Sequence, residues 1–489
     1  MNPENTYKHG YKWAFAYAAL FAVLAPFFST PREILEGFVE ILLADNMLIT
    51  DYFSLAGFGA ALLNVSAVTA ITVALMYRCR IPLNGTGILT IGLMSGFSFF
   101  GKSVFNMWFI LLGTWVYAKW SRQRFSQFLL ISLFSTSLSP LISHLFFYQD
   151  KFQINNMILS LFCGVLIGFV MPMMGPYAAY LLNEMTLYTS GFSVGLLCLV
   201  IVPILKSYGY QFNPVTVWTS GNNIPIGLMM GAFCIFLIYM GWRREGMQAV
   251  RNYFHLLKRS GVSSQDFTDL DGMGAVLINM GVNGILATLY IILIKGHLNG
   301  PTIGGILTII GFSAKGKHAA NIVPIIAGVA LGGITKQWSP NSPPAQLAAL
   351  FGTTLAPISG TFGPIAGVIA GFIHSSVVQH AGMGYSGINL YNNGFAGGIV
   401  SIVVYPVFVR IFRFNRYAEP SPGSPAAVRQ QLEAIKAQEA LNAQIFRHAH
   451  DVEIELEHEL GPGKSNLPFE LRRKAGDCSR VTAGPIDLI

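Results

Sequence analysis

The chain has 489 residues, of which 53% are hydrophobic and only 11% carry charge. Its mean hydropathy is +0.52, and its many apolar segments of about 20 residues exclude a soluble globular fold for residues 1–416. The net charge of +8 does not indicate a nucleic-acid partner, because the basic residues gather at segment ends, as in cytoplasmic loops. Four of the five cysteines lie in or beside apolar segments without metal-ligand spacing, so we expect no metal and no cofactor.

Apolar runs predict the membrane spans in chain order. The first half has runs near 12–29, 53–77, 127–147, 157–180 and 187–207, and the second near 222–242, 271–295, 343–358, 363–380 and 390–411. Between the second and third run of each half, Asn84–Tyr117 and Asn299–Gly332 open with Asn-Gly and break at Gly-Lys. Each piece is too short to span a bilayer, which predicts a re-entrant helical hairpin, with two thin spans as the competing interpretation.

The two halves repeat each other. LAGFGAALLN (Leu55–Asn64) returns as LDGMGAVLIN (Leu270–Asn279), and FSFFGKSVFN (Phe97–Asn106) returns as FSAKGKHAAN (Phe312–Asn321). The loop after the first span is acidic, whereas its counterpart at 243–267 is basic, so the two loops belong on opposite sides of the membrane. We therefore expect an all-α membrane protein of two inverted repeats, each with about five transmembrane helices and a hairpin.

Charge also predicts orientation and boundaries. The first repeat covers residues 1–212 and the inverted second repeat 213–416, with both termini on the cytoplasmic side of the cell's inner membrane. Residues 417–489 are polar and read as a cytoplasmic helix, near 426–444, followed by a disordered tail.

The Gly-Lys break in each hairpin is the leading candidate for a substrate site. Glycine (Gly101, Gly316) allows a sharp backbone turn and close approach of a solute. A lysine follows (Lys102, Lys317), and then an asparagine (Asn106, Asn321), at the start of a helix whose dipole attracts anions. A charged lysine at bilayer depth costs roughly 3 kcal/mol on insertion scales, so its presence in both halves calls for an explanation. The structural alternative is that each lysine reaches the surface or pairs with backbone carbonyls or with a helix C-terminus.

Four further residues are weaker candidates for contact with the solute. Asn84 and Asn299 could offer amide donors and acceptors at a pore mouth, or simply begin the hairpins as turns. Thr90 and Thr308 lie in matching ILTI sequences and either line the pathway or bond to backbone carbonyls.

The apolar spans lack carboxylates, which argues against a proton-driven symporter. The sequence favours a transporter or channel for a small polar or anionic solute, with no enzymatic activity. A cation channel or sodium-coupled carrier that uses hairpin carbonyls is the alternative. A membrane-embedded transferase is a weaker one, because no HExxH-like spacing occurs.

The segments NGTGILTIG, FFGKS, TSGFSVG, ILTIIGF, KGKHAAN and INLYNNGFAGG resemble those of a family of bacterial polytopic membrane proteins built around a domain of unknown function. The resemblance covers residues 10–412 and implies no substrate. In architecture alone, five spans per inverted half is similar to urea and ammonium transporter folds. The expected partners are a small-molecule or ion substrate, the lipid bilayer and a second copy of the chain in a homo-oligomer, without nucleic acid.

Overall fold

The computed structural model describes residues 3–45, 49–150, 153–213 and 215–412. The chain divides into two compact units, Met1–Tyr417 and Ala418–Ile489. The predicted polar helix near 426–444 and the tail after it lie outside the described residues. All elements below belong to the first unit.

The secondary-structure elements described in this unit are helices, apart from two strands of two residues each. Up to residue 217 the elements are α1 (Pro3–Leu24), α2 (Pro31–Leu43), β1 (Ile49–Thr50), α3 (Tyr52–Arg78), α4 (Gly85–Phe97), α5 (Trp108–Trp120), α6 (Leu129–Ser135), α7 (Ser139–Phe146), α8 (Ile154–Leu181), α9 (Thr189–Ser207) and β2 (Thr216–Val217). The remaining helices are α10 (Asn223–Glu245), α11 (Met247–Leu256), α12 (Phe267–Leu270), α13 (Gly272–Leu293), α14 (Gly300–Phe312), α15 (Ala319–Thr335), α16 (Pro343–Gly352), α17 (Ala356–Phe362), α18 (Pro364–Ala381) and α19 (Asn392–Ile411).

Nine helical stretches among the described residues are long and apolar enough to cross a membrane. They are Tyr7–Phe27, Tyr52–Arg78, Leu129–Phe146, Ile154–Leu181, Thr189–Ser207, Asn223–Glu245, Gly272–Leu293, Pro364–Tyr385 and Asn392–Ile411. The predicted span 343–358 instead consists of α16 and α17, joined by a 3₁₀ turn at Thr353–Leu355. Pro357 lies in the first turn of α17, where a missing N–H costs nothing, but it cannot continue the preceding helix.

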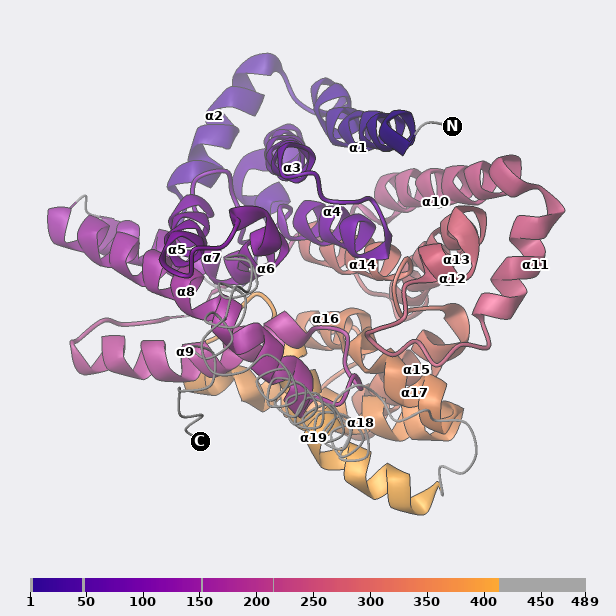
Figure 1. Cartoon of the computed structure of the whole chain (residues 1–489). Helices are drawn as coiled ribbons and strands as arrows, with labels where there is room; N and C mark the ends of the chain where they lie inside the picture. Colours follow the sequence, from indigo (N-terminus) through magenta and orange to yellow (C-terminus); the bar gives the residue numbers. More distant parts are fainter. Residues whose placement is uncertain (1–2, 46–48, 151–152, 214, 413–489) are drawn as a thin grey trace, which may run out of the picture. The chain divides into compact units, whose positions relative to one another are not determined.

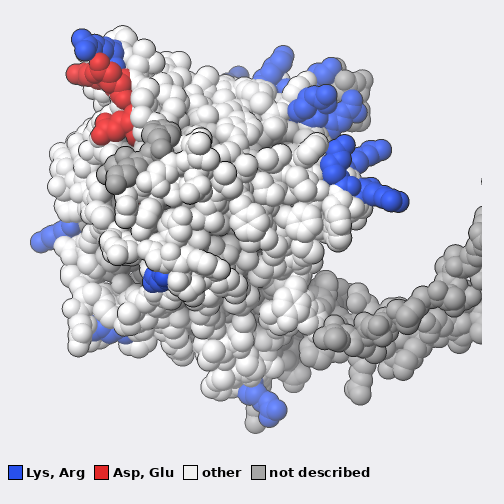
Figure 2. Space-filling model, turned by 90° about the vertical axis from the view of Figure 1, so that its left-hand side faces the viewer, with Lys and Arg blue, Asp and Glu red and all other residues white. Residues whose placement is uncertain are grey.

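The outer surface is largely apolar. Ile154 at the start of α8 is 73% exposed and Ile224 at the start of α10 is 78% exposed, and large apolar side chains lie exposed along both helices. Figure 2 shows a face on which uncharged surface predominates, with acidic side chains in one corner and most basic side chains near the edges. Such a surface fits a hydrocarbon solvent, in which charged groups are confined to the membrane's boundaries.

Two short amphipathic helices accompany the spans, one in each half. The acidic α2 packs on α3, and the basic α11 packs on α13. Thr30 and Glu33 form a capping box at the start of α2, and the backbone N–H of Thr30 holds the pKa of the Glu33 carboxyl below its usual value.

Helices α4 and α14 pack side by side at the centre of the unit (Figure 1). A Cβ on Gly96 would lie 2.6 Å from the carbonyl oxygen of Gly304, so the two backbones touch without side chains between them. Gly85, at the start of α4, adjoins the carbonyl of Ala314 beyond the end of α14, and Gly300 adjoins that of Phe99 in the same way. The two helices therefore run antiparallel.

The first backbone N–H of each of these helices donates to an aspartate carboxylate from the opposite half. The Asp51 carboxylate accepts from the backbone N–H of Gly300 at 3.2 Å, and the Asp266 carboxylate accepts from that of Gly85 at 3.1 Å. A carboxylate at a helix N-terminus satisfies an unpaired donor and complements the helix dipole. Strands β1 and β2 pair in parallel beside Asp51, with Ile49 opposite Thr216, and add a further tie between the halves.

Candidate functional site

The chain breaks at Gly-Lys in both halves, between α4 and α5 and between α14 and α15. Gly101 (φ +72°) and Gly316 (φ +97°) have left-handed conformations that an L side chain would strain. Asn106 holds the first break, since its Oδ1 accepts from Ser103 N–H and its Nδ2 donates to the Gly101 carbonyl. Asn321 makes the same pair of bonds, with His318 and Gly316.

A second asparagine secures each break from the neighbouring helix. Asn64 on α3 donates its amide to the carbonyls of Ser98 and Lys102, at 2.8 and 2.9 Å. Asn279 on α13 donates to Ser313 and Lys317, both at 2.7 Å. These amides satisfy carbonyls that the interrupted helices leave without partners. The four asparagines thus act on the backbone of the breaks.

Lys317 is fully buried and well provided with partners. Its ammonium donates to the Tyr188 hydroxyl and, at 2.7 Å, to Thr353 Oγ1. It also lies 4.6 Å from the centre of the Tyr188 ring and 5.1 Å from that of Phe312, distances at which ring quadrupoles attract a cation. Both oxygen partners are side chains, rather than the backbone carbonyls considered from the sequence.

Lys102 is equally buried but differently placed. Its ammonium donates at 3.2 Å to the Met94 sulfur, a weak acceptor. The ring centres of Phe97 and Tyr391 lie 6.0 and 5.9 Å away. Neither Lys102 nor Lys317 reaches the surface, since both are 0% exposed.

A cavity of about 470 Å³ lies between the two halves, within the size range of small-molecule sites. Its lining includes Phe97 with Phe312, Phe134 with Phe351, Leu187 with Leu390, Tyr188 with Tyr391, and Gly191 with Gly394, which are pairs at matching positions of the repeated segments. The other lining residues include Leu89 and Leu93 of α4, Leu130 and Ile131 of α6, and Thr189 and Ser190 of α9.

Among the described residues, Lys315 is the single charged one in that lining. Its ammonium donates to Thr86 Oγ1 at 2.9 Å. None of the ten site residues predicted from the sequence lines the cavity. Lys102 and Lys317 instead lie against the aromatic residues that form its wall, Phe97 and Tyr391 for the first lysine and Tyr188 and Phe312 for the second.

The weaker candidates from the sequence bond within their own helices, and Asn299 also donates its amide to the carbonyl of Thr219. Asn84 caps α4 by accepting from Gly87 N–H, and Asn299 caps α14 in the same manner. Thr90 and Thr308 donate to the carbonyls four residues earlier. Helices α4 and α14 both have 13 residues and therefore align from end to end. In this alignment Thr90 lies closer to the start of its helix than Thr308 does, so the two threonines are not equivalent despite the shared ILTI letters.

The sequence reasoning missed the two tyrosines of the cavity wall. Tyr188 and Tyr391 recur in the blocks LYTSGF and LYNNGF, where the repeated small residues pointed to helix packing. The usable signal was the tyrosine itself, a polar tip retained in both copies of an apolar block. Each tyrosine contacts the lysine of the opposite half, far away in the chain, so the local spacing of residues does not predict the contact.

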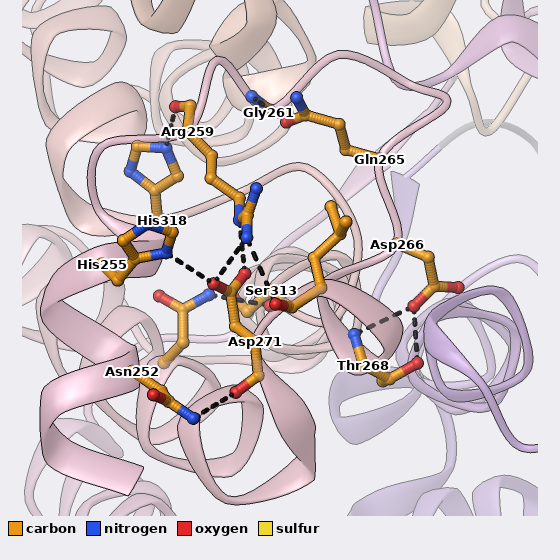
Figure 3. A network of polar contacts seen from close by, with 12 residues as sticks. Asn252, His255, Arg259, Gly261, Gln265, Asp266, Thr268, Asp271, Ser313 and His318 are labelled. Atoms are coloured by element: carbon orange, nitrogen blue, oxygen red, sulfur yellow. Dashed lines mark hydrogen bonds and ion pairs between the residues drawn. The ribbon is translucent and has the colours of Figure 1, made fainter. Parts of the chain in front are cut away.

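A polar network fixes the loop before α13 and reaches the second break (Figure 3). The buried Asp271 carboxylate accepts from Arg259 at 2.6 and 2.9 Å and from His255 at 3.2 Å. The Arg259 carbonyl is bonded by the His318 ring at 2.8 Å. Burial lets such a bidentate pair hold a defined geometry, so the loop and the break form one structural unit.

Within the described residues, no group of three or more His, Cys, Asp or Glu side chains could hold a metal ion. No match was found among curated proteins or among solved structures. A family model does match, over residues 30–207 and 245–410. The chain belongs to that family, DUF1576, which is described as a protein of unknown function.

Proposed function

We propose that this DUF1576 protein is an integral membrane carrier for a small polar or anionic solute, without enzymatic activity. The solute would pass along the interface of two inverted repeats, each with a re-entrant hairpin. The acidic α2 would lie outside, and the basic α11 and both termini in the cytoplasm, as the positive-inside rule requires.

The arrangement of α4 and α14 supports the inverted repeat. These equivalent helices run antiparallel, and each begins on the other half's aspartate. The amides of Asn64 and Asn279 make the same two bonds at positions exactly one repeat apart in the chain. A two-fold axis in the membrane plane that relates the two halves would give each contact of one half an equivalent contact in the other.

The cavity between the halves is the observation that carries the proposal. Its wall is built from matching residues of both repeats, as expected for a transporter whose site lies at the repeat interface. Lys315 lies in the wall, and the ammonium groups of Lys102 and Lys317 lie behind it. In a low-dielectric surrounding, such cations favour a solute that is negative or presents an electron-rich oxygen.

The asymmetry of the cavity favours a carrier over an open channel. Leu130 and Ile131 of α6 line it and are half-buried, whereas their counterparts on α16, Leu347 and Ala348, are buried and outside it. Inverted repeats that adopt different conformations open to one side at a time, and exchange of those conformations opens the other side.

The alternative, a cation pathway built on hairpin carbonyls, is less well supported. The carbonyls of Gly101, Lys102, Gly316 and Lys317 already accept hydrogen bonds from asparagine amides. A cation would have to compete with these amides and would also lie near a buried ammonium.

Flux into proteoliposomes tests the proposal. The solutes would be chloride, formate, acetate, benzoate and urea, with sodium and potassium as the cation arm. Ser190→Trp places a large side chain in the cavity wall and should block flux, whereas Ser207→Trp, at the exposed far end of the same helix, should not. Cation-selective flux, or flux that Ser190→Trp leaves unchanged, would contradict the proposal.

A further inference from the structure

Tyr391, whose ring lies near Lys102, and two residues on the segments that adjoin it carry buried polar groups without described partners. The Tyr391 hydroxyl, Ser137 Oγ and Asn389 Nδ2 make no hydrogen bond with any described residue. All three side chains are at least nine-tenths buried. Buried polar atoms in proteins are nearly always bonded, so such a cluster calls for a physical explanation.

Backbone hydrogen bonds connect the segments that carry these groups. The backbone N–H of Leu390 donates to the Ser137 carbonyl at 3.2 Å, which brings the two segments into contact. Asn389 Oδ1 accepts from Tyr391 N–H at 2.9 Å, so its Nδ2 is the end left free. The Tyr391 ring centre lies 5.9 Å from the Lys102 ammonium.

The other half shows the same groups fully paired. Tyr188 accepts from the Lys317 ammonium, and the hydroxyls of Thr354 and Thr186, at the positions of Ser137 and Asn389, bond to each other at 2.7 Å. The fold is therefore able to satisfy this arrangement internally. In the first half the buried Lys102 ammonium faces a thioether, and Tyr391, Ser137 and Asn389 each keep a polar group without a described partner.

We propose that Lys102, Tyr391, Ser137 and Asn389 form a binding site for a monoanionic group. A buried ammonium needs strong hydrogen-bond acceptors or a counter-charge, because desolvation without either is costly, and Lys102 has only a sulfur among the described residues. The ammonium and the Nδ2 amide nitrogen of Asn389 are donors only, and both hydroxyls can donate, so the four groups suit an acceptor such as a halide or a carboxylate. Phe97 and Tyr391 also line the cavity, which places the site directly behind its wall.

Two sources would supply this chemistry. An inorganic anion would be a resident ion of the protein, and this version stands whether or not the protein transports anything. A carboxylate would be the end of the transported solute, and this version rests on the proposed function. The experiment has to separate them.

Thermal unfolding of the purified full chain in detergent provides the test. Sodium sulfate, whose anion is neither a halide nor a carboxylate, is the base salt, and sodium chloride, bromide, formate or benzoate is titrated against it at constant ionic strength. A ligand that binds the folded state raises the unfolding temperature in a saturable way. The variant is Lys102→Met, and the matched control is Lys317→Met, which removes the equivalent lysine whose ammonium already has two oxygen partners.

We expect a saturable rise in wild type and in Lys317→Met, and its loss in Lys102→Met, with an apparent Kd weakened at least about tenfold. Without added anion, Lys317→Met should unfold at a lower temperature than wild type and Lys102→Met should not. Tyr391→Phe, which removes only a hydroxyl, should weaken the response.

The anions that act identify the source. A response to halides without halide flux into proteoliposomes indicates a resident inorganic ion, and a response to carboxylates alone indicates the solute's own carboxylate. No response in wild type, or an undiminished response in Lys102→Met, overturns the site while leaving the transport proposal to its flux assay. Binding without any flux leaves the site in place and overturns the transport proposal.

Discussion

The contact between α4 and α14 is testable with a single methyl group. Gly96→Ala adds a Cβ that would lie 2.6 Å from the Gly304 carbonyl oxygen. No Cβ tolerates an oxygen at that distance, and the contact is backbone, so one helix must move. Gly231→Ala in α10 is the matched control, because a Cβ there meets nothing within 4 Å.

The two substitutions should have opposite effects on stability. Alanine improves helix formation over glycine by about 0.5–1 kcal/mol, and this is the only expected effect at Gly231. Overpacking of a closely packed contact costs about 1–3 kcal/mol, which outweighs that gain at Gly96. The difference between the two variants should therefore be about 1–3 kcal/mol, in favour of Gly231→Ala.

The buried thiols of the protein supply the assay. Cys163, Cys198 and Cys234 are free and buried, so a thiol-reactive fluorophore reports on unfolding as temperature rises. At on the order of 2 °C per kcal/mol for a chain of this size, Gly231→Ala should unfold roughly 2–6 °C above Gly96→Ala. Equal unfolding temperatures, or a more stable Gly96→Ala, would refute a direct backbone contact between α4 and α14.

Three further predictions concern the halves and their interface. Lys102→Ala combined with Lys317→Ala should abolish solute flux in proteoliposomes while the chain still elutes as a folded species on size exclusion; wild-type rates would remove the lysines from the mechanism. Asp51→Ala removes the acceptor of three backbone N–H groups and should lower the free energy of unfolding by about 3 kcal/mol or more. Asp51→Asn keeps one oxygen, so its unfolding temperature should fall less in the same melting assay. Leu130→Cys should react with an impermeant maleimide from one side at rest, and Leu347→Cys only from the other side and only during turnover; labelling of both at rest would indicate a channel.

The membrane class of this protein is a property of its composition. Apolar segments of bilayer length can be read without knowledge of their neighbours, and nine described helices have that length and composition. The breaks at Gly101 and Gly316 are similarly local, since only glycine adopts their left-handed backbone without strain. Whether the hairpins re-enter the membrane, and what the lysines do for a solute, remain predictions.

The environment of each lysine is a property of tertiary structure alone. Lys102 and Lys317 stand in nearly identical local sequences, but one faces a thioether and the other two hydroxyls. The thioether belongs to Met94 in the preceding helix, whereas Thr353 comes from a later segment and Tyr188 and Tyr391 come from the opposite half.

The sequence by itself determined where the chain is apolar, where it breaks and which segments recur, because these depend on residue type and short-range backbone preference. The tertiary structure decided that α4 and α14 meet through glycines, that aspartates of the opposite half cap them, and that aromatic rings separate both lysines from a cavity. Such contacts join residues far apart in the chain, and their energies depend on distances that no local pattern specifies.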